Sequence, residues 1–399
     1  MVGSRIRRKR LAAGLSLQEF SDRLKTVGTT LTRAALSNYE TGKTAPSAKV
    51  LWAIAKVLEE SLDYFMTEKE VTLTLHGYRK KAASTKGELE SVRARVEDEI
   101  EKHVLLDQSL ATPKKDQPLD RVVVSSPEEA EKLADDLRKS WELGSQPIAS
   151  VTTLLEDHGW YVVEIPDGPH VDGFSGYVQE TKRHFAVSRW IKAIDRVRLN
   201  LLHEAGHSLF RNDDQKLEEK CANRFAASFL LPRDRVVEEF GEHRTALELQ
   251  ELLSVKKKYG ISMQAITFRL RDVGVISDSY FTLLFIYYSK MSYRIEEPGS
   301  DNLPFQEHPL ALQTKVHRAL AEGLITEQDA LRMIPDLRLR QDHFAPISSA
   351  AIKELMHKSR EERDEILRMA ADAALSDYEE PELNISDIVE PYDEDSSAR

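Results

Sequence analysis

The sequence predicts an α+β, mostly helical fold that is divided into several domains. A chain of 399 residues is longer than one ordinary domain. Short helical patterns separated by Gly and Pro fill residues 1–66, and the clearest strand patterns lie within residues 71–188. The predicted segments are an N-terminal helix-turn-helix bundle (1–68), a helical connector and linker (69–125), a core domain with a small β-sheet (126–240), a helical C-terminal region (241–378) and an acidic flexible tail (379–399).

The composition is typical of a soluble globular protein, with 41% hydrophobic and 31% charged residues. The single cysteine, Cys221, excludes a disulfide framework and is typical of a reducing compartment. The N-terminus lacks the apolar core of a signal peptide, and the longest apolar run, residues 280–288, is too short to cross a bilayer. We therefore expect a cytoplasmic location, no membrane partner, and a buried strand or helix at 280–288.

The net charge of −11 conceals an asymmetry along the chain. Residues 1–70 contain 12 Lys or Arg and 8 Asp or Glu, so this segment is basic and the remainder is acidic. A basic unit joined to an acidic body indicates that only the N-terminal unit meets nucleic acid. An exposed charged helix without a partner would give the same balance, so charge alone leaves both interpretations open.

The N-terminal segment is expected to contain four or five short helices. Ser16 and Glu19 form a capping-box pattern at the start of the second helix. Residues 32–39 form the third helix, and Gly42 and Pro46 end it. Short helix, turn and short helix is the layout of a helix-turn-helix domain.

The middle of the chain mixes strand and helix patterns. In the connector, residues 71–75 alternate like a strand and residues 87–106 form a charged amphipathic helix. A linker follows at 112–120. The elements expected in the core domain are helices at 126–141, 148–157, 195–210 and 217–230, a strand at 160–165, and a hairpin of strands at 173–178 and 184–188.

The run from Leu201 to His207 contains a metal-binding pattern, H-E-x-x-H. Residues four positions apart share one face of a helix, so His203 and His207 can bind one ion. Glu204 lies beside them, where it can take a proton from a water molecule that the ion acidifies. Apolar residues at steps of three or four predict that this helix is packed in the core. Two surface histidines beside a salt-bridging glutamate are the alternative.

A catalytic zinc site requires a third protein ligand and leaves one position for water. The next helix offers Glu218 and Glu219, and its apolar periodicity favours Glu219 as the ligand and leaves Glu218 solvated. Asn223, one turn further on, is expected to orient a ligand from outside the metal shell. Zinc is the expected cofactor, although two histidines and a carboxylate also suit manganese or iron.

These residues carry a resemblance to a known family. H-E-A-G-H at 203–207, followed by E-x-x-A-N-x-F-A-A-x-x-L-L-P at 219–232, resembles the ImmA/IrrE family of bacterial metallopeptidases. The resemblance covers about residues 126–275, and one departure is Cys221, where the family often has glutamate. It implies a gluzincin-type zinc peptidase core and limited proteolysis, often of a cognate repressor, in the control of phage-related, stress or defence genes.

Residues 1–66 resemble the phage-repressor (XRE) helix-turn-helix that some members of this family carry at the N-terminus. The resemblance implies that residues 32–39 form the recognition helix in the major groove. The implied base contacts are Arg33, Ala34, Ser37 and Asn38, and the implied phosphate contacts are Gln18 and Lys43. Such repressors usually bind a double-stranded operator as homodimers, because one short helix recognises few base pairs. A protein-binding bundle of the same fold is the alternative.

Three weaker features each allow two interpretations. Residues 256–277 look like a second helix-turn-helix, although a helical hairpin that supports the core is favoured. Residues 346–383 resemble short bacterial antitoxins, and an amphipathic helix explains the same pattern. By topology His184 and Tyr177 are nearest to the site as stabilisers of an oxyanion, although ordinary core or surface roles are favoured.

The predicted function is that of a DNA-binding regulator whose zinc-dependent peptidase domain cleaves a specific protein, either a repressor or the chain itself. The alternative is a non-proteolytic DNA-binding repressor or antitoxin of a toxin–antitoxin-like operon, which uses the zinc fold as a sensor or scaffold and binds a toxin. Glu204 favours the enzyme, because a purely structural site requires only ligands.

Overall fold

The computed structural model describes residues 2–67, 71–76, 85–112, 120–166, 171–300, 303–335 and 337, and a few positions between 358 and 369. Residues 1–337 form one compact unit and residues 338–399 a second, and the helices and strands given below belong to the first. The acidic tail predicted at 379–399 and most of the antitoxin-like stretch at 346–383 lie outside the described residues. None of the described helices is long and apolar enough to span a membrane.

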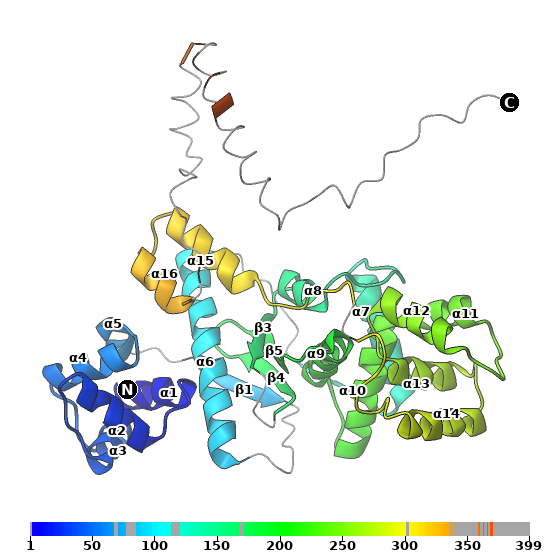
Figure 1. The fold of residues 1–399 in the computed structure, drawn as a ribbon, viewed down its shortest axis with the longest axis horizontal. Helices are drawn as coiled ribbons and strands as arrows, with labels where there is room; N and C mark the ends of the chain where they lie inside the picture. Colours follow the sequence, from blue (N-terminus) through cyan, green and yellow to red (C-terminus); the bar gives the residue numbers. More distant parts are fainter. Residues whose placement is uncertain are drawn as a thin grey trace. The chain divides into compact units, whose positions relative to one another are not determined.

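The N-terminal bundle contains five short helices, as its sequence predicted (Figure 1). They are α1 (Val2–Ala12), α2 (Leu17–Thr26), α3 (Arg33–Glu40), α4 (Ala48–Val57) and α5 (Leu62–Met66). Ser16 and Glu19 form the expected capping box at α2, and Thr32 caps α3. Ile6, Phe20 and Leu36 are fully buried at the centre of the bundle. The helix-turn-helix layout is therefore present.

A four-stranded sheet lies at the centre of the following domain. Its strands are β1 (Leu73–His76), β3 (Tyr161–Ile165), β4 (Gly173–Val178) and β5 (Arg183–Arg189), in the order β1-β4-β5-β3. The predicted hairpin is present, since β4 and β5 pair antiparallel, while β3 runs parallel to β5. The strand expected at 71–75 begins two residues later and pairs antiparallel with β4.

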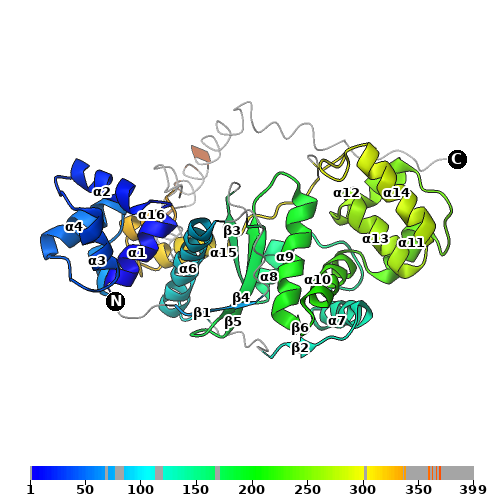
Figure 2. The ribbon, with the colours of Figure 1, turned by 90° about the horizontal axis from the view of Figure 1, so that it is seen from below.

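Two helices cover opposite faces of this sheet (Figure 2). On one face, α6 (Lys86–Ser109) places Val96 and Ile100 in an apolar cluster with Phe174, Phe185 and other strand residues. On the other face, α9 (Ile194–Leu209) packs against β4 and β5. Because side chains alternate along a strand, each strand presents one set of residues to α6 and the other set to α9.

The remaining helices lie on the α9 side of the sheet or, for α15 and α16, at the C-terminal end of α6. Their bounds are α7 (Pro127–Ser140), α8 (Val151–Asp157), α10 (Gln215–Leu230), α11 (Arg233–Phe240), α12 (Leu249–Tyr259), α13 (Met263–Val273), α14 (Asp278–Lys290), α15 (Ala311–Ala321) and α16 (Glu327–Met333). A short parallel pair, β2 (Val122–Val123) and β6 (Phe210–Arg211), follows the linker. Helix α10 packs against both α7 and α9.

Two expectations for the helical region can now be compared with the structure. Helices α12 and α13 pack together in the core, and Lys256 is buried between the carboxylates of Asp195 and Glu297, as expected for a supporting hairpin. The apolar run 280–288 is helical, but the expectation that it is buried was wrong. Only Tyr288 of α14 is buried, because one face of the helix packs on α13 while Leu283 and Ile286 lie exposed.

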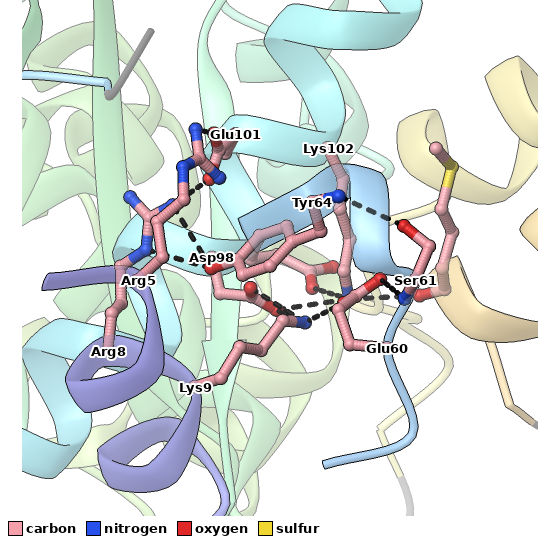
Figure 3. A network of polar contacts seen from close by, with 11 residues as sticks. Arg5, Arg8, Lys9, Glu60, Ser61, Tyr64, Asp98, Glu101 and Lys102 are labelled. Atoms are coloured by element: carbon pink, nitrogen blue, oxygen red, sulfur yellow. Dashed lines mark hydrogen bonds and ion pairs between the residues drawn. The ribbon is translucent and has the colours of Figure 1, made fainter. Parts of the chain in front are cut away.

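Helix α1 joins the bundle to α6 through buried ion pairs (Figure 3). Glu101 of α6 accepts hydrogen bonds from the guanidinium groups of Arg5, at 2.7 Å, and Arg8. Lys9 lies 2.8 Å from Asp98 of α6 and 2.6 Å from Glu60 of the bundle. Several basic residues of α1 are therefore neutralised inside the protein, so the basic balance of residues 1–70 overstates the charge available to nucleic acid.

Candidate metal centre

The two histidines of the H-E-x-x-H pattern lie on one buried face of α9. Their Nε2 atoms are 3.1 Å apart, and both side chains are almost completely buried. The helix is held in place near its start by Arg198, whose guanidinium pairs with Glu307 in a fully buried contact. Since the helix is fixed on both the sheet side and the α10 side, the directions of His203 and His207 are fixed as well.

The expected third ligand lies opposite the histidines on α10. Carboxylate oxygens of Glu219 are 3.5 Å from Nε2 of His203 and 3.4 Å from Nε2 of His207. One nitrogen of each histidine and one oxygen of Glu219 lie within 4.8 Å of one another. The structure therefore brings together the three residues that sequence spacing had selected.

Residues of α10 also hold the outer nitrogens of both imidazoles. Nδ1 of His203 lies 3.0 Å from Oδ1 of Asn223, the residue expected to orient a ligand. Nδ1 of His207 lies 3.0 Å from Oε1 of Glu218. Both partner oxygens are acceptors, so each Nδ1 carries the proton and each Nε2 presents a lone pair to the centre.

Glu218 is not solvated, contrary to the expectation from periodicity. Besides the His207 ring it accepts hydrogen bonds from the guanidinium of Arg121, at 2.6 Å, and from the backbone N–H of Asn212, at 3.0 Å. Burial alone would raise the pKa of Glu218, but the Asn212 N–H, His207 and Arg121 lower it. The carboxylate thus stays charged. One signal for this was available, because Glu218 stands four residues before Ala222, on the line of the buried face.

This donor set fits a metal cation. Two imidazole nitrogens whose lone pairs face each other at 3.1 Å repel unless a positive charge lies between them. The carboxylate of Glu219 adds a third donor on the same side, and N and O donors of this kind suit zinc. The fit rests on the convergence of the three donors and on the fixed imidazole tautomers.

Glu204 is buried beside the strand β4. A Cβ atom added at Gly173 of β4 would lie 3.1 Å from Cγ of Glu204 and 2.5 Å from the carbonyl oxygen of Val187. Only glycine therefore leaves space for the Glu204 side chain at this point. Gly173, which sequence analysis did not single out, links the sheet to the candidate site.

Two residues from the connector also reach the region of the site. Nε of Arg121 donates to the carbonyl of Phe210, 2.8 Å away, and so holds the turn between α9 and α10 while its other nitrogen binds Glu218. His76 of β1 lies with its ring centroid 5.7 Å from that of Tyr177. Neither residue has ligand spacing to the H-E-x-x-H pattern, so the sequence offered no signal for them.

The residues considered as oxyanion stabilisers lie on neighbouring strands. His184 is buried and stacks on Trp160 with ring centroids 4.7 Å apart, which is an ordinary core arrangement. Tyr177 lies on β4 between His184 and the edge strand β1, since it pairs with His184 on one side and with Thr74 on the other. The contacts of His184 agree with the core role that was favoured for it.

The residues predicted to contact DNA lie on α2, on α3 and just after α3. Arg33 and Ala34 are exposed in the first turn of α3, and Ser37 and Asn38 are half-buried one turn later. Residues at these spacings share one side of a helix. Gln18 is exposed on α2 and donates to Asp22, and Lys43 is exposed after α3.

Comparisons with known protein families agree with the two resemblances inferred from sequence. Residues 6–65 match the helix-turn-helix family model, and residues 155–271 match the model of the IrrE N-terminal-like domain, a peptidase family. No curated protein matches the chain. The second match contains the H-E-x-x-H helix and α10, whereas β1, α6 and β2 lie outside both matches.

Proposed function

We propose that this chain, a DNA-binding regulator that carries an IrrE-like peptidase domain, is a zinc-dependent endopeptidase that cleaves a specific protein. The substrate class is a cognate repressor or the chain itself, and the biological role is the control of stress, phage-related or defence genes. The observation that carries the proposal is the convergence of His203, His207 and Glu219, with Glu204 buried beside them.

The residues of the site have separable roles in peptide hydrolysis. His203, His207 and Glu219 would hold the ion, which would supply Lewis acidity toward a water molecule and the peptide carbonyl. Glu204 takes the proton from the attacking water and passes it to the nitrogen of the leaving amine. Asn223 and Glu218 keep each imidazole in the tautomer that presents Nε2 to the ion.

The helix-turn-helix domain directs this activity to a regulated gene. We propose that the chain binds a double-stranded operator as a homodimer, because one recognition helix covers too few base pairs for useful specificity. Arg33, Ala34, Ser37 and Asn38 of α3 face the bases in this arrangement. Gln18 and Lys43 contact the flanking phosphates.

The decisive experiment compares the wild type with Glu204→Gln. Each protein is incubated with zinc or manganese and with candidate repressor proteins, and intact-mass spectrometry reports cleavage of either chain. We expect a defined cut with the wild type only, because glutamine cannot accept the proton. Equal metal content in both proteins, from elemental analysis, is the control. No cut in any reaction, with metal bound, would contradict the peptidase and favour a repressor or antitoxin that uses the metal fold as a scaffold.

A further inference from the structure

The edge of the sheet nearest to the candidate site is occupied by a strand from the connector. Strand β1 pairs antiparallel with β4, with Thr74 opposite Tyr177 and His76 opposite Ser175 (Figure 2). β4 is also the strand whose Gly173 lies against Glu204. β1 lies between the two segments that match known families, so neither match accounts for it.

The two faces of β1 have different surroundings. Leu73 and Leu75 pack into the apolar cluster between the sheet and α6. Because side chains alternate along a strand, Thr74 and His76 point to the opposite side, where α9 lies. On β4 the same alternation places Phe174 and Val178 toward α6, and therefore Gly173 toward α9 and Glu204. The polar face of β1, formed by Thr74 and His76, thus lies on the same side of the sheet as the candidate metal centre.

His76 is one of the two residues of β1 that point to this side of the sheet. Both of its ring nitrogens are buried, and neither has a hydrogen-bond partner among the residues that the structure describes. Burial, followed by the proximity of Arg121 and His184, lowers the pKa of His76 to about 4, although the carboxylate of Glu218 acts in the opposite direction. His76 is therefore a neutral imidazole within electrostatic range of the metal-binding face of α9.

β4 is shaped for the close approach of another backbone. A Cβ atom at Gly176 would lie 1.9 Å from the carbonyl oxygen of Thr74, so a larger residue at this position would displace a strand that pairs as β1 does. The backbone N–H of Gln179 donates to the carbonyl of Thr72 at 3.0 Å. Hydrogen-bonded positions alternate along an antiparallel pair of strands, so the next ones after Thr72 and Gln179 are Thr74 and Tyr177.

We propose that β1 occupies the position in which an extended peptide substrate pairs with β4, so that residues 73–76 are a built-in competitor for the peptidase site. Addition of an extended peptide to a sheet edge is a common mode of peptide recognition, in which the backbone gives affinity and alternate side chains give specificity. This inference rests on the proposed peptidase function. The substrate class is an extended protein segment with apolar residues at alternate positions, which take the places of Leu73 and Leu75 against α6.

A labelled peptide tests this directly. Fluorescein-labelled Val-Thr-Leu-Thr-Leu-His, the sequence of residues 71–76, is titrated with the full-length chain in a Glu204→Gln background, and fluorescence anisotropy reports binding. Thr74→Pro removes the N–H that pairs with Tyr177 and frees the edge of β4. We expect Thr74→Pro to bind the peptide at least about tenfold more tightly than the parent chain. In the parent chain β1 covers β4 in most molecules, and only the small fraction with a free β4 edge can bind the peptide.

Matched variants make the outcome specific. Thr72→Pro is the control, because the Thr72 N–H binds the Glu180 carboxylate and not the β4 backbone, and it should leave the affinity unchanged. Adding Gly176→Ala to Thr74→Pro should abolish binding, because the new Cβ would clash with the backbone of a peptide that pairs with β4 as β1 does. Leu75→Asp, which places a charge in the α6 cluster, should free the edge as Thr74→Pro does.

The proposal is overturned if neither Thr74→Pro nor Leu75→Asp raises the affinity while thermal unfolding shows that either variant is folded. It is also overturned if the Gly176→Ala addition leaves binding intact, since the peptide would then bind elsewhere. The readout does not depend on hydrolysis. If the peptide binds as expected but protein with an intact Glu204 cleaves nothing, the proposed peptidase function fails and the strand-addition site stands.

Discussion

Helices α1 and α9 both carry a conspicuous run of polar residues, yet only the run on α9 has a chemistry that local spacing could predict. On α9 the partners of the histidines follow within 20 residues, because Glu218 and Asn223 stand on the next helix. On α1 the partner of Arg5 is Glu101, 96 residues away, and the partner of Lys9 on α6 is 89 residues away. Local periodicity carries information only about partners that lie on the same or a neighbouring element.

The comparison also shows what a basic run can mean. Arg5 and Arg8 share Glu101, Lys9 lies between Asp98 and Glu60, and Arg10 pairs with Glu40. Burial alone would raise the pKa of Asp98, but Lys9 lowers it, so the carboxylate stays ionised. Buried ion pairs add little net stability over apolar packing, although removing one partner is costly. Arg5, Arg8 and Lys9 therefore join α1 to α6, and Arg10 joins α1 to α3, so these four residues are engaged within the protein.

The largest predicted effect is a loss of stability when Glu101, the residue of α6 that pairs with α1, is replaced. Glu101→Ala leaves two buried guanidinium groups without their carboxylate, so we expect it to lower the free energy of unfolding by about 3–5 kcal/mol. Urea denaturation of the full-length chain measures this loss. Glu90→Ala is the control, because Glu90 pairs with Arg7 in an exposed contact that is worth less than about 1 kcal/mol. Equal losses for the two variants would show that α1 is not held by the Glu101 pairs.

A second prediction distinguishes α1 from α3 in DNA binding. Arg33→Ala combined with Asn38→Ala removes two predicted base contacts, each worth about 1–3 kcal/mol, and should abolish retention of a duplex that the wild type selects from a random library. A gel-shift assay gives the result. Arg7→Ala removes an exposed arginine of α1 and should retain the duplex. Retention by the double variant, or loss by Arg7→Ala, would place the interface on another surface.

The sequence predicted most of the elements that build the candidate site, and the reasons are physical. The strands β4 and β5 and the helices α9 and α10 follow from alternation and from apolar steps of three or four. His203, His207 and Glu219 follow from helix geometry and from the short connection between the two helices. In each case the signal and its partner lie within about one supersecondary unit.

The features that were missed depend on contacts between distant segments. The pairing of β1 with β4 joins residues about 100 positions apart, and neither strand's own sequence specifies its neighbour. Arg121 reaches Glu218 from beyond the linker, so this partner of Glu218 could not be inferred from α10 and its neighbours in sequence. The prediction that α14 is buried was wrong for the same reason, because the sequence of an apolar run does not show how much of its surface other elements cover.

The smallest predicted effect tests the local logic of α9 itself. Asn223→Ala removes the acceptor that fixes the Nδ1 proton of His203, so the imidazole can turn or change tautomer, and zinc affinity should fall by about 10–100-fold. Competition with a chelating dye measures the affinity. Asn223→Leu keeps a side chain of similar volume but lacks the acceptor oxygen, so it should lose affinity as Asn223→Ala does, which a role in packing alone would not explain. Unchanged affinity in Asn223→Ala would mean that α9 positions His203 without help from α10. The geometry of the metal ligands on α9 would then be set by that helix itself, whereas α1 is positioned by partners on a distant helix.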